Sequence, residues 1–93
     1  MIEHLPRGRA YLSDQLQRAA LSIPLNIVEG AGEYAVDEKA RFYRMAKRSA
    51  TECAGILDVC QQLGLVREDR YMKGRELLIG TVSMLIKMAQ RQR

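Results

Sequence analysis

Small and apolar side chains recur at alternating steps of four and three residues through the middle of the chain, and this spacing most constrains the fold. The residues are Phe42, Ala46, Ser49, Cys53, Ile56, Cys60 and Leu63. Such steps place side chains on one helix face and form the seam by which helices pack in bundles. We therefore expect one long helix that begins just after Asp37 and ends at Leu63, with Gly64 as its stop.

Two further helices are expected on either side of this one. The first begins near Ser13, a favourable N-cap, with Asp14 in its first turn, and ends in the EGAGE segment at 29–33. The other begins around residues 68–69 and runs towards the C-terminus. Its inner face carries Tyr71, Leu78, Val82, Leu85 and Ala89. No segment alternates as a strand would, and the links are short, so neighbouring helices run antiparallel. The expected fold is all-α, an antiparallel up-and-down helical bundle in one domain over residues 1–93.

Composition narrows the class of protein further. Hydrophobic residues make up 47% of the chain and charged residues 28%, which is typical of a globular protein rather than a disordered one. No apolar run is long enough for a membrane span, and the N-terminus lacks the apolar region of a signal peptide. The expected compartment is therefore the cytosol.

The two cysteines do not indicate a disulfide or a metal site. Cys53 and Cys60 are seven residues apart, so in one helix their Cα atoms lie about 10 Å apart, beyond disulfide reach. The only histidine, His4, is distant in sequence. We expect both cysteines to act as small buried hydrophobic residues and expect neither a metal nor a cofactor.

The first helix carries two separate apolar stripes. One contains Leu16, Ala19, Ala20, Ile23 and Ile27, and the other contains Leu21, Leu25 and Val28. Two stripes imply two packing partners: the other helices of the chain, and a further helix of this chain or of a neighbouring copy. Leu21, Leu25 and Val28 are thus a candidate oligomer interface. Pro24 should bend the helix near Ala20, either to wrap it around the core or to shape an interface.

A polar row lies between these stripes. It consists of Gln15, Arg18, Ser22, Asn26 and Glu29. One interpretation is a hydrogen-bonded network at a helix or subunit junction, in which Glu29 pairs with an arginine; another is a ligand or nucleic-acid contact through Arg18 and Asn26. A catalytic role for Glu29 is disfavoured, since no second acid, base or nucleophile lies at a spacing that would suggest a catalytic pair. No catalytic residue is expected, and the chain is not expected to be an enzyme.

Five basic residues and no acidic ones occur between positions 39 and 51. They are Lys39, Arg41, Arg44, Lys47 and Arg48, and Lys87, Arg91 and Arg93 add charge near the C-terminus. The chain has a formal net charge of +4. The stretch predicts either an ordinary solvated helix face or a surface that contacts nucleic-acid phosphates.

The block DQ-x-x-RA-x-x-SIP-x-NI-x-EG, together with the later AKRSATECAGILDVCQQLGL, resembles a known family. This family comprises four-helix bundle proteins encoded in intervening sequences of bacterial 23S ribosomal RNA genes, and the accessory protein of diversity-generating retroelements is similar to it. The resemblance covers roughly residues 5 to 90. Its pattern falls on Gln15, Arg18, Ala19, Ser22, Ile23, Pro24, Asn26, Ile27, Glu29 and Gly30.

The resemblance implies a bundle that assembles into a ring, typically a homopentamer, without catalytic residues. For the retroelement relatives it implies binding to a reverse transcriptase and to RNA or DNA through a basic surface. The alternative is a structural or protein-interaction module that binds no nucleic acid.

This chain departs from the family pattern in two places. Family members usually begin with an additional tryptophan-bearing amphipathic helix, whereas this sequence contains no tryptophan and is expected to form three helices. The exposed stripe of Leu21, Leu25 and Val28 could then reflect the absent helix instead of an oligomer surface. Ala31 and Glu33 stand where relatives often carry an aromatic and a basic residue, which argues against nucleic-acid binding at that loop.

Overall fold

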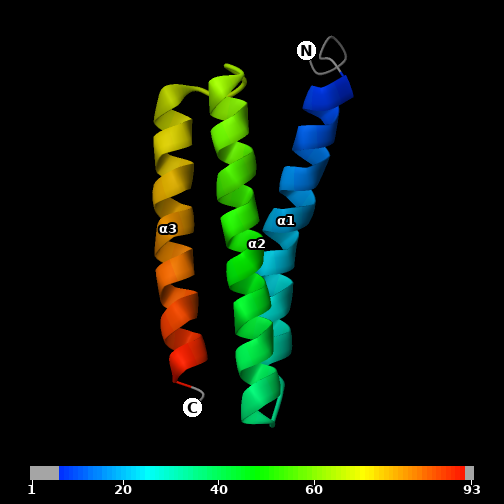
Figure 1. The fold of residues 1–93 in the computed structure, drawn as a ribbon, viewed down its shortest axis with the longest axis vertical. Coiled ribbons are helices and arrows are strands. Elements are labelled where there is room, and N and C mark those ends of the chain that lie inside the picture. The colour runs from blue at the N-terminus through cyan, green and yellow to red at the C-terminus, as the bar shows by residue number, and fades with distance from the viewer. Residues whose placement is uncertain (1–6, 92–93) are drawn as a thin grey trace.

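The chain folds into three long helices joined by short connections (Figure 1). The computed structural model describes the backbone of residues 7–91 and the side chains of residues 10–91. The helices are α1 (Arg7–Ala31), α2 (Val36–Gln62) and α3 (Glu68–Gln90). The predicted all-α class is confirmed, and residues 7–91 contain no strand. None of the described helices is long and apolar enough to cross a membrane.

The ends of α2 and α3 lie close to their predicted positions. Gly64 adopts a φ of 71°, a left-handed conformation that ends α2 because only glycine takes it without steric cost. Its amide donates to the Gln61 carbonyl at 3.1 Å, and the Leu65 amide donates to that of Cys60 at 2.9 Å. Glu68 and Asp69 occupy the first turn of α3, where the helix dipole stabilises acidic side chains.

The predicted start of α1 is wrong. The helix begins at Arg7, so Ser13 lies inside it and does not cap it. Asp14 is likewise not in the first turn; its carboxylate pairs instead with Arg18 Nε at 3.0 Å. An i,i+4 ion pair of this kind supports a helix that continues through both residues.

The three helices form a flat array with α2 in the middle. Helix α2 packs against both α1 and α3, whereas α1 and α3 make only marginal contact. The Cα trace measures 48 × 22 × 13 Å along its principal axes. Figure 1 shows the N-terminal half of α1 leaning away from α2 and its C-terminal half lying beside α2. The change of direction falls in the middle of α1, where the missing amide hydrogen of Pro24 is expected to bend a helix.

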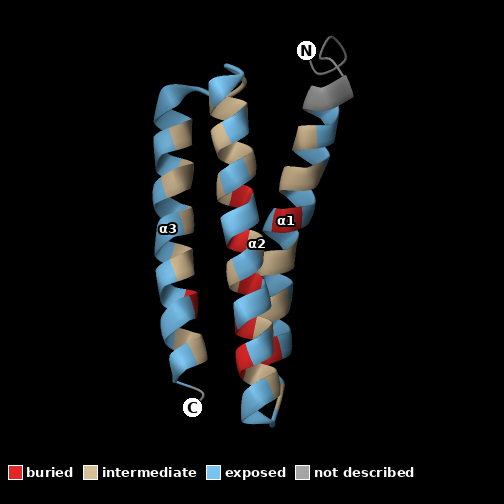
Figure 2. Ribbon diagram, in the orientation of Figure 1, coloured by how far each residue is buried: buried red, intermediate tan, exposed pale blue. Residues whose placement is uncertain are grey.

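The buried residues lie between the middle of the molecule and the end that carries the α1–α2 connection (Figure 2). Tyr43, Ala46 and Leu85 form the centre of the core, and Ile27, Met88 and Ala89 pack against them. Along α2 no residue beyond Cys53 is buried. One end of the array therefore has a closed core, while at the other end α1 leans away from α2 (Figure 1).

The predicted inner residues match this core in most positions. Ala46 and Cys53 of the α2 seam are buried, and the five predicted inner residues of α3 are buried or half-buried. Two predictions are wrong: Leu63, in the turn after α2, is 54% exposed, and Ala20 of α1 is exposed. Tyr43, absent from the predicted seam, is buried instead, at 6% exposure.

Candidate nucleic-acid interface

The five basic residues predicted as one surface separate into two groups. Lys39 lies close to the end of α1, and its Nζ donates to the carbonyl oxygens of Gly30 at 3.1 Å and Ala31 at 3.2 Å. These carbonyls belong to the last turn of α1, where the helix leaves carbonyl oxygens without intrahelical partners and the dipole favours a cation. Lys39 therefore links α2 to the end of α1, and its ammonium group is engaged in hydrogen bonds within the chain.

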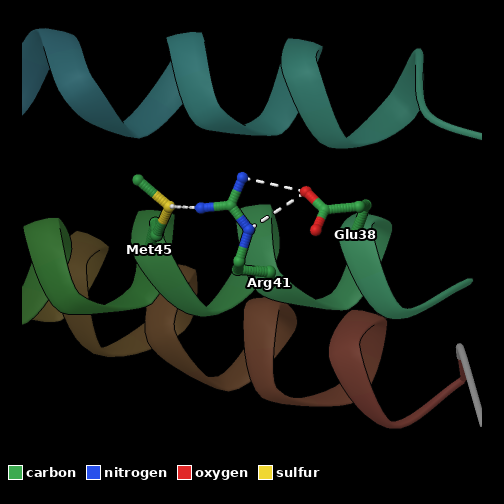
Figure 3. Close-up of polar contacts among 3 residues, drawn as sticks. All are labelled: Glu38, Arg41 and Met45. Atoms are coloured by element: carbon green, nitrogen blue, oxygen red, sulfur yellow. Dashed lines mark hydrogen bonds and ion pairs between the residues drawn. The ribbon is translucent and has the colours of Figure 1, made fainter. Parts of the chain in front are cut away.

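Arg41 is also engaged within the chain (Figure 3). Its Nε and Nη2 atoms donate to Glu38 Oε1 at 3.1 and 2.9 Å, and its Nη1 lies 3.4 Å from the sulfur of Met45. The guanidinium carbon sits 4.6 Å from the ring centre of Phe42. The hydrogen bond and the charge of Glu38 raise the pKa of Arg41 further. An arginine with a carboxylate partner of its own is a poor first choice for binding a phosphate.

Arg44, Lys47 and Arg48 remain, and together they line one open hollow on the surface of α2. Thr51 and Glu52, one turn further along the helix, complete its lining. Within residues 10–91 none of the three cations forms an ion pair or a hydrogen bond through its side chain. The Thr51 hydroxyl donates to the Lys47 carbonyl at 3.0 Å, which leaves its oxygen free to accept. The hollow thus brings together three positive charges without ion-pair partners among the described residues and one carboxylate, that of Glu52.

A second hollow reaches two of the same cations from the side of α3. It is lined by Arg44, Lys47, Leu85, Ile86, Ala89 and Gln90. Lys87 and Arg91, predicted to add positive charge, are exposed on and just beyond this end of α3, whereas Arg93 lies outside the described residues. Helical spacing of Thr51 from Arg44 and Lys47 could have predicted its place beside them. No sequence signal indicates Gln90, because its place depends on how α3 packs on α2.

The predicted polar row of α1 is an internal network at its centre. Ser49 of α2 donates from Oγ to Ser22 Oγ at 2.8 Å, and the Asn26 amide donates to the Ser22 carbonyl and hydroxyl oxygens, each at 2.9 Å. Arg18 pairs with Asp14, and Glu29 is exposed without an ion pair among residues 10–91. The expected pairing of Glu29 with an arginine is therefore not made among the side chains of residues 10–91.

The second apolar stripe of α1 lies on the surface. Leu21, Leu25 and Val28 are 60%, 56% and 67% exposed. The sequence pattern correctly separated these residues from the inner stripe, in which Ala19 is buried and Ile23 and Ile27 are half-buried.

The cysteines are both free. Cys53 is buried and Cys60 is half-buried on α2, as expected for small hydrophobic residues of the seam. Burial raises the pKa of the Cys53 thiol, and the neighbouring charge of Glu52 raises it further. No group of three or more potential metal ligands occurs among the described residues; His4 lies outside them.

These features define an elongated, open three-helix protein with an unpaired cationic hollow on its central helix. The chain belongs to the 23S rRNA-intervening sequence protein family, whose model matches residues 1–87. No curated protein matches the chain. Family membership does not itself assign a biochemical activity.

Proposed function

We propose that the protein is a non-enzymatic accessory of nucleic acid or of a ribonucleoprotein, and that it binds phosphates through the hollow on α2. The observation that carries this proposal is the cluster of Arg44, Lys47 and Arg48 without carboxylate partners among the described residues. The five-residue basic surface predicted from sequence is thereby reduced to three residues, since Lys39 and Arg41 are engaged within the chain.

The charges of this cluster favour an anionic partner. Like charges three and four residues apart on a helix destabilise it by a few tenths of a kcal/mol, about as much as opposite charges stabilise it. Arg44, Lys47 and Arg48 stand at such spacings. A polyanion relieves the repulsion and gains from each cation it contacts, which also makes its binding strongly dependent on salt.

The decisive experiment compares two triple variants with the same change in net charge. One replaces Arg44, Lys47 and Arg48 by alanine, and the other replaces the exposed cations Arg67, Arg70 and Lys73 at the opposite end of the array. Gel shift with a structured RNA at low and moderate salt should show at least about a tenfold loss for the first variant and little change for the second. Equal losses in both variants would show that only net charge matters and would contradict the assigned site.

A second candidate role is that of a structural or protein-interaction module. The exposed Leu21, Leu25 and Val28 favour it, because contiguous apolar side chains on a surface mark contacts with other proteins. A second copy of the chain is the partner we propose for this stripe. The pentameric ring, the reverse transcriptase partner and the cytosolic location stay predictions from the sequence and from the family resemblance.

A further inference from the structure

We infer that the hollow on α2 binds the phosphate backbone of a nucleic-acid duplex, without preference for base sequence and with weaker binding of single strands. This inference rests on the proposed function and specifies its ligand. Three features of the structure support it: where α2 lies in the array, where the aromatic rings lie, and how the cations are spaced.

Because of its position in the array, α2 cannot enter a groove of the duplex and contact base edges. The major groove of B-DNA, about 12 Å wide, admits a single helix, and the major groove of an RNA duplex is too narrow for side chains to read. Helix α2 is the middle element of the array, with α1 packed on one side and α3 on the other, and the array is 22 Å across in Cα positions alone. A duplex can therefore approach the exposed side of α2 only with its outer surface, which consists of phosphates and sugars.

The aromatic rings of the chain lie where they cannot stack on bases at the hollow. Single-strand binding proteins combine a basic groove with exposed rings, each of which contributes about 1–3 kcal/mol per stacked base. The chain has four tyrosines, one phenylalanine and no tryptophan, and none of them lines the hollow. Tyr43 is buried in the core, Phe42 is half-buried beside Arg41, and Tyr71 is half-buried against Asp58. Tyr11 and Tyr34 are exposed, on α1 and in the α1–α2 connection.

The spacing of the cations suits a dense row of phosphates. Arg44 and Thr51 are seven residues apart on one helix, so the polar lining extends about 10 Å along α2. A DNA duplex presents one negative charge per about 1.7 Å of its axis, and one of its strands presents half as many. When phosphate contacts are the only source of affinity, the ligand with the higher charge density binds more tightly.

The test uses the full chain with four RNA probes: one duplex, each of its separated strands, and a second duplex of scrambled sequence. Fluorescence anisotropy over a salt series should give equal affinities for the two duplexes and several-fold weaker binding of either unstructured strand. The plot of log affinity against log salt should have a slope of about −2 to −3 per bound chain for three phosphate contacts. The Arg44→Ala, Lys47→Ala, Arg48→Ala variant should lose most of this slope.

The possible failures are distinct. Tighter binding of a single strand, or a strong preference between the two duplexes, that still depends on the three cations would overturn the duplex inference and leave the proposed function standing. No binding of any probe, or binding unchanged in the triple variant, would overturn both. Competition by polyglutamate as effective as that by the duplex would also overturn both, since the hollow would then accept any polyanion.

Discussion

The ring of Tyr43 lies directly against the backbone of Gly30, in the last turn of α1. A Cβ atom built on Gly30 would stand 2.7 Å from Tyr43 Cε1, closer than real Cβ atoms come to such a neighbour, and 3.2 Å from Phe42 Cβ, closer than most real Cβ contacts. Gly30 is buried, and Tyr43 is part of the core. The absence of a side chain at Gly30 therefore allows α1 and α2 to approach each other at the closed end of the array.

Replacement of Gly30 by alanine should destabilise the protein by about 1–3 kcal/mol, the usual cost of forcing extra volume into a packed core. Gly55→Ala is the matched control, because a Cβ at Gly55 meets nothing within 4 Å. This second change should stabilise α2 by roughly 0.5–1 kcal/mol through helix propensity. Urea unfolding of both variants measures the difference, and a Gly30→Ala protein as stable as the Gly55→Ala protein would contradict the close packing.

Lys39 should contribute to stability and little to RNA binding, although it lies in the same basic stretch as the hollow. Its ammonium group donates to the Gly30 and Ala31 carbonyls, so Lys39→Met should lower the free energy of unfolding by about 1 kcal/mol. Arg48→Met removes an exposed side chain without an ion pair among the described residues and should change stability by less than about 0.5 kcal/mol. Thermal unfolding should show the lower stability for Lys39→Met, whereas RNA binding should show the lower affinity for Arg48→Met. The same rank in both measurements would refute this division of roles.

The sequence predicted those features that depend on neighbours along the chain. The heptad steps located α2 and its buried Ala46 and Cys53, and Gly64 marked its end correctly. The start of α1 was missed because Ser13 has the chemistry of a cap, yet the helical pattern before it continues to Arg7.

What the sequence could not predict depends on contacts between helices. The engagement of Lys39 requires that the end of α1 lie beside the first turn of α2. The burial of Tyr43 depends on Gly30 in another helix, and periodicity within α2 carries no signal of it. For the same reason the basic stretch could be recognised as a surface but could not be divided into engaged and unpaired charges.

The two thiols should differ strongly in reactivity. Cys53 is buried with a raised pKa, whereas Cys60 is half-buried and lies beyond the last buried residue of α2. Because thiolate and access are both needed for attack on a disulfide reagent, Cys60 should react first in the native protein. Labelling of Cys53→Ser and Cys60→Ser proteins separates the two rates, and the protein that retains only Cys53 should react mainly through unfolding. Rapid native labelling of Cys53 would show that this part of α2 is open.

Tyr71 should make stability fall at alkaline pH. Its hydroxyl donates to Asp58 Oδ1 at 2.7 Å, and this hydrogen bond, with burial and the Asp58 charge, raises the pKa of Tyr71. The folded state therefore holds the phenol proton more tightly than the unfolded state. The resulting stability is fully present below the unfolded pKa of tyrosine, near 10, and is lost as pH rises through the folded pKa.

Ultraviolet titration of tyrosinate in the native protein measures this shift directly. Asp58→Ala should move the transition of Tyr71 down towards the ordinary value, and Tyr71→Phe should remove that transition from the titration curve. Asp58 also accepts hydrogen bonds from Arg75 at 3.1 and 3.2 Å, so Arg75→Gln serves as a control that retains the hydroxyl–carboxylate contact. An unchanged titration curve in the Asp58→Ala protein would show that the hydrogen bond does not persist in solution.

The exposed stripe of Leu21, Leu25 and Val28 on α1 should mediate association between copies of the chain. If Leu21, Leu25 and Val28 meet a second copy, Leu25→Glu should shift the protein to a smaller species in sedimentation velocity, because it places a charge in a desolvated contact.

Val36→Glu is the matched control, since Val36 is also exposed and stands at the N-terminus of α2, where an acidic residue is favourable. The Leu25→Glu chain should keep its helical content, because its side chain lies outside the core of its own chain. A monomeric parent protein, or equal sedimentation of all three proteins, would show that the stripe is not a self-association surface. Loss of assembly in the Leu25→Glu protein with unchanged RNA affinity per chain would separate the two surfaces, one apolar on α1 and one cationic on α2.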